Sequence, residues 1–237
     1  MNYKIIQDEK LLKDFIEWLP ELAPHEKYYM CLFARNKYCK ELVHIKSDKS
    51  QLKRFVTDKE RMFKKIKQLE IEEGCYFQKE TPVPLQAMAL YIMPNPRDMY
   101  KASINTMVKL ATSIRDQNVL MNPHQEALSE IQRTKSRTCY VDFDVDFPDN
   151  LSEEGIKDKI EEFRQKLPNT INPSAIKLLR TRGGLHILVD PNKVEKEYKN
   201  SFYQQIKLFS GIDNVGDQMI PVPGCTQGSF TPHFINL

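Results

Sequence analysis

The chain has 237 residues, 41% of them hydrophobic and 28% charged, a balance that excludes a disordered or fibrous protein and allows a core without disulfides or metals. No apolar run approaches the ~18 residues of a membrane span, no secretory signal is visible, and five scattered cysteines favour reduced thiols in a cytoplasm. The net charge of +3 arises within residues 1–130, which hold 21 Lys and Arg against 18 Asp and Glu.

Helices and strands of the first half are predicted from the spacing of apolar residues. Residues 8–19 have helical spacing that ends at Pro20, and residues 27–36 are rich in aromatics, as in a buried strand. Residues 50–69 predict one amphipathic helix. A strand over 86–93 and a long helix over 97–117 complete this half.

The polar face of the helix predicted over 50–69 is basic and includes Lys53, Arg54, Lys64 and Lys65. Such a face is usually only solvated, and the alternative is contact with the phosphates of a nucleic acid. Single strands are commonly held in basic grooves, so this face, together with Arg97, is the predicted DNA-binding surface.

The second half is predicted to alternate strands and helices, with a strand over 138–147, a helix over 152–165, strands over 175–181 and 185–190, a helix near 194–209 and a final strand. Gly183 and Gly184 form the tight turn between the two central strands. This order fits an RRM-like sheet covered by helices, so the predicted fold class is α+β.

Acidic and apolar residues alternate strictly over residues 140–147. Strand side chains alternate between faces, so Asp142, Asp144 and Asp146 are expected on one face and the apolar residues on the other. An exposed acidic face is one interpretation of this row of mutually repelling carboxylates. The other is a site for Mg²⁺ or Mn²⁺, because oxygen ligands two residues apart suit hard cations that bind phosphate oxygens.

The glycine turn is flanked by hydrogen-bond donors that a triphosphate requires. The residues predicted to bind nucleotide are Arg180, Thr181, Arg182, Gly183, Gly184 and His186. Taken alone, the pattern is also that of an ordinary hairpin. Farther along, Asp213 and Asp217 precede a Pro-Gly turn, a segment that alone would be read as an acidic surface loop.

In this order, the three segments resemble the motifs of the archaeo-eukaryotic primase superfamily. Asp142-Phe143-Asp144 is similar to its Asp-hydrophobic-Asp motif, and Thr181 through His186 is similar to its Ser/Thr-x-Gly-Gly-x-His turn. An acid shortly before a Pro-Gly-Ser/Thr turn is matched by Asp213 or Asp217 before Val222-Pro223-Gly224. The motifs span residues 140–228.

The resemblance implies a DNA primase or primase-polymerase catalytic domain that carries out template-directed nucleotidyl transfer. It implies that Asp142, Asp144 and a third aspartate hold two Mg²⁺ or Mn²⁺ ions, and that Thr181 and His186 contact the phosphates of a nucleoside triphosphate. Residues 1–130 would be an N-terminal α/β lobe beside a single-stranded DNA template, and residues 131–237 the catalytic lobe. A helicase or another replication or repair protein stays open as a partner.

Some residues depart from the family pattern. Pro221 stands where members often have a basic residue, and Cys225 where they have Ser or Thr. One phosphate contact is therefore either missing or supplied by Arg180 or Arg182. Asp146 is an additional acid, and the metal pair Asp144/Asp146 is an alternative to the preferred Asp142/Asp144. Asp213 is preferred over Asp217 as the third ligand. An idle nucleic-acid-binding replication-initiator module and a metal-dependent nuclease are the alternative functions.

Overall fold

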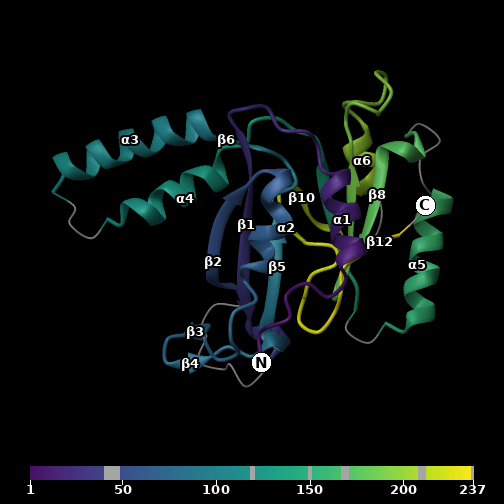
Figure 1. The fold of residues 1–237 in the computed structure, drawn as a ribbon. Helices are drawn as coiled ribbons and strands as arrows, with labels where there is room; N and C mark the ends of the chain where they lie inside the picture. The colour runs from purple at the N-terminus through teal and green to yellow at the C-terminus, as the bar shows by residue number, and fades with distance from the viewer. Residues whose placement is uncertain (40–48, 118–120, 149–150, 167–170, 208–211, 236–237) are drawn as a thin grey trace.

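The computed structural model describes residues 1–39, 49–117, 121–148, 151–166, 171–207 and 212–235. These residues form two five-stranded antiparallel sheets, a short two-stranded one and six α-helices (Figure 1), which confirms the predicted α+β class. None of the helices in these ranges is long and apolar enough to span a bilayer.

The first sheet has the strand order β11-β5-β1-β2, and β6 pairs with the start of β1. Its strands are β1 (Glu26–Arg35), β2 (Lys49–Thr57), β5 (Met88–Ile92), β6 (Arg97–Asp98) and β11 (Ile220–Pro221). Helices α1 (Glu9–Trp18) and α2 (Lys59–Lys67) contribute apolar side chains to the core on one face of this sheet. A small hairpin of β3 (Phe77–Gln78) and β4 (Thr81–Pro82) follows α2.

The single helix predicted over 50–69 is wrong. Residues 49–57 form the edge strand β2, which pairs with β1, and the helix begins only at Lys59 after the N-cap Asp58. Leu52 and Phe55 are spaced as on a helix, whereas Leu52 and Val56 would share one face of a strand. Pairing with the buried strand β1 decides for the strand. Lys53 and Arg54 are neighbours on a strand and therefore point to opposite faces, so the predicted continuous basic face does not form.

A helical hairpin connects the two sheets. The helix expected over 97–117 is confirmed as α3 (Met99–Arg115), and it packs against α4 (Pro123–Arg133), which the sequence analysis missed. Figure 1 shows this pair projecting from one side of the body.

The second sheet has the strand order β10-β7-β9-β8-β12. Its strands are β7 (Val141–Asp146), β8 (Ile176–Arg180), β9 (Gly184–Val189), β10 (Ile212–Gly216) and β12 (His233–Ile235). Helices α5 (Glu153–Lys166) and α6 (Phe202–Lys207) pack on one face. The helix expected near 194–209 is shorter than predicted, because residues 197–201 form turns before α6 begins.

The two sheets share one core. Leu179 and Leu188 of the second sheet belong to the apolar cluster that contains α1 and β1. Beyond β10 the chain returns to the first sheet, where β11 pairs with β5, and then crosses back so that β12 pairs with β8. Residues 220–221 thus extend the first sheet, although they lie in the half predicted as the second lobe.

Candidate active site

The acidic strand and the glycine hairpin meet in the second sheet. Val141, Phe143 and Val145 of β7 face helices α5 and α6, so Asp142 and Asp144 lie on the opposite face, as expected. β9 is the neighbour of β7 in the sheet, and the register places His186 directly opposite Asp144. Residues far apart in the sequence are thereby brought to one site.

His186 links the two carboxylates. Its Nδ1 lies 3.0 and 2.9 Å from the two carboxylate oxygens of Asp142, and its Nε2 lies 3.6 Å from Oδ1 of Asp144. The Asp142 side chain is 1% exposed and that of Asp144 27% exposed. The carboxylate of Asp142 is therefore enclosed, whereas that of Asp144 is partly exposed.

The charge of the imidazole is set by these acids. Burial alone favours the neutral ring, but the negative charge and hydrogen bond of Asp142, with smaller contributions from Asp144 and Asp146, raise the pKa of His186 above its ordinary value. A protonated His186 would offset the repulsion within the row of carboxylates.

The structure divides the residues predicted to bind nucleotide. Thr181 closes the turn, because its Oγ1 accepts a hydrogen bond of 3.1 Å from the backbone N–H of Gly184. Strand alternation puts His186 on the carboxylate face and Arg180 on the α5 side. Arg182 and Gly183 lie exposed at the tip. The hairpin thus offers one set of groups to the carboxylates and another to a cavity beyond the turn.

The two candidates for the third acidic ligand lie on and just after β10, the other neighbour of β7. Asp213 falls at an irregularity in the pairing of β10 with β7, and its side chain lies outside the described part of the structure. Oδ1 of Asp217 accepts hydrogen bonds of 2.7 Å from Arg97 and 2.8 Å from Asn95. Asp217 therefore helps to join β10 to the first sheet.

The five residues predicted to bind DNA do not form one surface. Arg97 is fully buried and also donates to the backbone oxygens of Asn95 and Gln132. It therefore stabilises the fold and does not face a DNA strand. Lys65 donates to the backbone oxygen of Val56, and Lys53 and Lys64 are exposed on different elements. The role of these lysines and of Arg54 in DNA binding stays a prediction.

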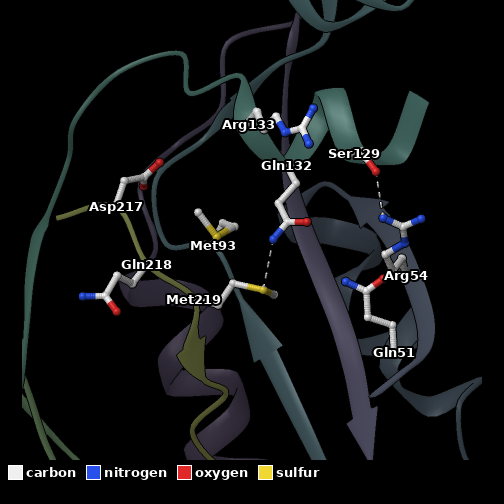
Figure 2. Close-up of a pocket in the computed structure, with 9 residues that line it drawn as sticks. All are labelled: Gln51, Arg54, Met93, Ser129, Gln132, Arg133, Asp217, Gln218 and Met219. Atoms are coloured by element: carbon white, nitrogen blue, oxygen red, sulfur yellow. Dashed lines mark hydrogen bonds between the residues drawn. The ribbon is translucent and has the colours of Figure 1, made fainter. Parts of the chain in front are cut away.

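Arg54 lines an open groove of about 730 Å³ between β2, α4 and residues 217–219. Figure 2 shows Arg54 reaching the hydroxyl of Ser129 on α4, a hydrogen bond of 3.2 Å, while Gln132 approaches the sulfur of Met219 near the centre of the groove. Asp217 borders the same groove, and Asn95 bonds both to Asp217 and to the backbone oxygen of Tyr140, so the groove lies near the start of β7.

The donor set of the site fits a hard divalent cation in its chemistry. Asp142 and Asp144 supply carboxylate oxygens from one strand face, although both Asp142 oxygens also contact His186. In the part of the chain that the structure describes, no group of three or more His, Cys, Asp or Glu residues is arranged to hold a metal. Mg²⁺ is usually bound through one or two carboxylates plus phosphates and water, so two aspartates would suffice with a nucleotide.

Two buried polar residues that the sequence analysis did not single out hold the site in place. Asn95 is 1% exposed, and its Oδ1 accepts from the backbone N–H groups of Cys139 and Tyr140 just before β7. Gln227 is 4% exposed and accepts a 2.8 Å bond from the backbone N–H of Arg182. The only sequence signal for either is its position beside a proline or glycine turn.

Comparison of the chain with models of known protein families, with curated proteins and with solved structures finds no match.

Proposed function

We propose that the chain is the catalytic domain of a DNA primase or primase-polymerase that joins nucleotides on a single-stranded DNA template. The observation that carries this proposal is the position of Asp142, Asp144 and His186 on one face of neighbouring strands. Those residues come from two of the three motifs that resemble the archaeo-eukaryotic primase superfamily. The two motifs are far apart in the sequence, so their proximity in the structure is an independent argument for the resemblance.

The topology supports an RRM-like catalytic sheet as part of the same proposal. The second half has the element order β-α-β-β-α-β from β7 to β10, and the strands lie in the order β10-β7-β9-β8. With both helices on one face, the other face is left for the carboxylates and the first half of the chain.

In the proposed reaction, a 3′-hydroxyl loses its proton to solvent and its oxygen bonds to the α-phosphorus of a nucleoside triphosphate. The bond from that phosphorus to the oxygen that bridges to the β-phosphate breaks, and pyrophosphate leaves. Asp142, Asp144 and Asp213 are the residues that would hold two Mg²⁺ or Mn²⁺ ions. The chemistry that such ions supply is a lower pKa of the attacking hydroxyl and compensation of charge on the leaving group. His186 holds Asp142 in place through Nδ1.

The groove beside Arg54 is the proposed path of the template. Its lining combines the guanidinium groups of Arg54 and Arg133 with the amides of Gln51 and Gln132. Cationic groups bind the backbone of a strand, and amides can pair with bases that are not stacked in a duplex. Asp217, which lines the groove, shares the partner Asn95 with Tyr140, the residue just before the carboxylate strand β7.

We expect the double variant Asp142→Ala, Asp144→Ala to lose nucleotide incorporation, measured by primer synthesis and extension on a single-stranded template with Mg²⁺ or Mn²⁺. Loss of two metal-binding carboxylates removes the groups on which charge compensation depends. Asp142→Asn, which preserves the shape of the buried side chain, should lose activity as well and guards against a folding defect. Full activity in the double variant would contradict the mechanism.

The exposed acid Asp158 on α5 offers a matched control. Asp158→Ala should retain activity, and far-UV circular dichroism should show that all variants are folded. Incorporation of ribonucleotides and deoxyribonucleotides is measured separately, which also identifies the preferred substrate.

An idle nucleic-acid-binding module is favoured by one observation: both oxygens of Asp142 already contact His186, so the pair is satisfied internally. Calorimetric titration with Mn²⁺ and a nucleoside triphosphate separates the two functions, because an idle module would bind neither at this site. Incubation of labelled DNA with metal and without nucleotide tests for a nuclease, which alone would shorten the strand.

A further inference from the structure

The outer face of helix α3 carries a row of exposed apolar side chains, which we call the α3 row. It consists of Tyr100, Ile104, Met107, Ala111 and Ile114, all of them exposed. Figure 1 shows α3 at the upper edge of the projecting α3–α4 pair. Single exposed apolar residues are common on proteins, but a contiguous row of large ones is typical of an interaction site.

The opposite face of α3 is already occupied by α4. Ala102 is 1% exposed, and Asn105 and Lys109 are half-buried. The ammonium group of Lys109 pairs with the carboxylates of Glu126 and Glu130 on α4. Because the inner face of α3 is small and polar, the apolar outer face is not the one that attaches this helix to the rest of the molecule.

The spacing within the α3 row indicates the shape of the surface that would cover it. Its residues follow one another at intervals of four, three, four and three positions. This alternation places side chains along one line of a helix, and it is the pattern with which two helices pack side by side. α3 has 17 residues and is therefore about 25 Å long, which is enough for about four turns of such packing.

The charges beside the α3 row favour an acidic partner. Lys101 and Arg115 are exposed near its two ends, and residues 99–115 contain no Asp or Glu. Arg115 also pairs with Asp116, but both side chains are more than half exposed, and such a pair contributes little. A second copy of α3 would offer no acid to either cation, whereas acidic side chains beside the apolar row of another helix would compensate both.

A membrane surface fits the α3 row less well than a helix does. Helices that lie on membranes have a polar face that is rich in exposed Lys and Arg and turned toward water. In α3 the polar face packs against α4, and Lys109 on that face is already paired with two carboxylates.

We propose that the α3 row binds an amphipathic helix of another protein, whose own apolar row has the same spacing and is flanked by Asp or Glu. None of the residues of the α3 row lines the groove beside Arg54 or belongs to the strands that carry Asp142, Asp144 and His186. The inference therefore does not depend on the proposed function, and either can fail without the other.

The test uses two fluorescently labelled synthetic peptides, each about three heptads long, with Leu at the two apolar positions of every heptad. The positions that flank this apolar row are all Glu in one peptide and all Lys in the other, so neither peptide pairs with itself. We expect the whole protein to bind the Glu peptide about tenfold more tightly than the Lys peptide, measured by fluorescence anisotropy.

The double variant Ile104→Gln, Ile114→Gln should weaken binding of the Glu peptide about tenfold or more, because two apolar contacts are lost. Lys101→Glu together with Arg115→Glu should reverse the preference, so that the Lys peptide binds more tightly. Ile71→Gln, which changes an exposed isoleucine outside α3, is the matched control and should leave the affinity unchanged. Circular dichroism should show that all variants are folded.

Failure of the Glu peptide to bind, equal affinity for the two peptides, or unchanged affinity in the isoleucine double variant would overturn the inference. A dimer of the original protein in sedimentation velocity that the double variant does not form would assign the α3 row to a second copy. Co-sedimentation with vesicles of phosphatidylcholine and phosphatidylserine that is lost in the double variant would assign the row to a membrane. Either of these two results would also overturn the inference.

Discussion

At the scale of single residues, a buried ion pair secures the start of the first sheet. Glu26 is 2% exposed and accepts bonds of 3.0 and 3.2 Å from the guanidinium of Arg137, and another of 2.9 Å from the backbone N–H of Ala23. Burial alone would raise the pKa of Glu26, but these hydrogen bonds outweigh it and lower the pKa below 4.5. The carboxylate form is therefore the one that stabilises the fold.

We expect Glu26→Gln to lower the free energy of unfolding by about 2 kcal/mol at pH 7, because a hydrogen-bonded charge is lost. A group whose pKa is depressed by folding stabilises above its unfolded pKa, and this contribution is lost as the pH falls through the folded value. The difference in the free energy of unfolding between the variant and the original protein, measured by urea unfolding, should therefore become smaller below pH 4.5.

Glu9→Gln is a matched control, because the ion pair of Glu9 with Lys13 is more than half exposed. Its effect should stay within about 0.5 kcal/mol at both pH values. A gap for Glu26→Gln that does not change with pH would contradict the role of the charge.

At the scale of the secondary-structure element, the two glycines of the β8–β9 hairpin have different roles. A Cβ at Gly184 would lie 1.9 Å from the backbone oxygen of Val145, whereas at Gly183 the nearest atom would be 3.9 Å away. Gly184 is thus required for close pairing of β9 with β7, and Gly183 lies at the open tip.

We expect Gly184→Ala to cost about 3 kcal/mol of stability, since the two strands that carry Asp144 and His186 must move apart. Gly183→Ala should change the free energy of unfolding by less than about 1 kcal/mol. Urea unfolding of both variants measures the difference, and equal losses would contradict this assignment.

The α3 helix exposes more large apolar side chains than a surface helix usually does. Its large apolar side chains Tyr100, Ile104, Met107, Val108 and Ile114 are 57% to 78% exposed. Lys109 instead pairs with Glu126 and Glu130 of α4. Ion pairs therefore contribute to holding this hairpin together.

At the scale of the whole molecule, the two sheets are expected to unfold together. Leu188 lies on β9 but is fully buried in the core of the first sheet. Trp18 of α1 packs against two aromatic residues of the second half. The centre of its ring lies 4.4 Å from that of Tyr140, on which it stacks, and 4.8 Å from that of Phe234. Each half therefore completes the core of the other.

We expect Leu188→Ala to lower stability by about 3 kcal/mol, because it leaves a cavity in this shared core. Trp18 is the single tryptophan, so its fluorescence reports on the junction while far-UV circular dichroism reports on the whole chain. Both signals should shift together to lower urea concentration. Leu185→Ala, on the helix-covered face, should also shift them together, and two separate transitions would contradict a shared core.

The sequence by itself determined the elements with a strong period. Alternation in residues 140–147 identified β7 and assigned its two faces correctly, and apolar spacing in residues 8–19 identified α1. These signals are local, since they depend only on which side chains one helix or strand can bury. The α+β class followed from their order.

Only the tertiary structure decided the rest. Residues 50–57 became a strand because β1 offered a partner for pairing, and Arg97 became a core residue because Asp217, distant in sequence, accepts its hydrogen bond. Likewise, nothing in the sequence between Tyr38 and Arg182 predicts that these two side chains are in contact. Pairing, burial and charge compensation depend on neighbours in space, which local composition does not specify.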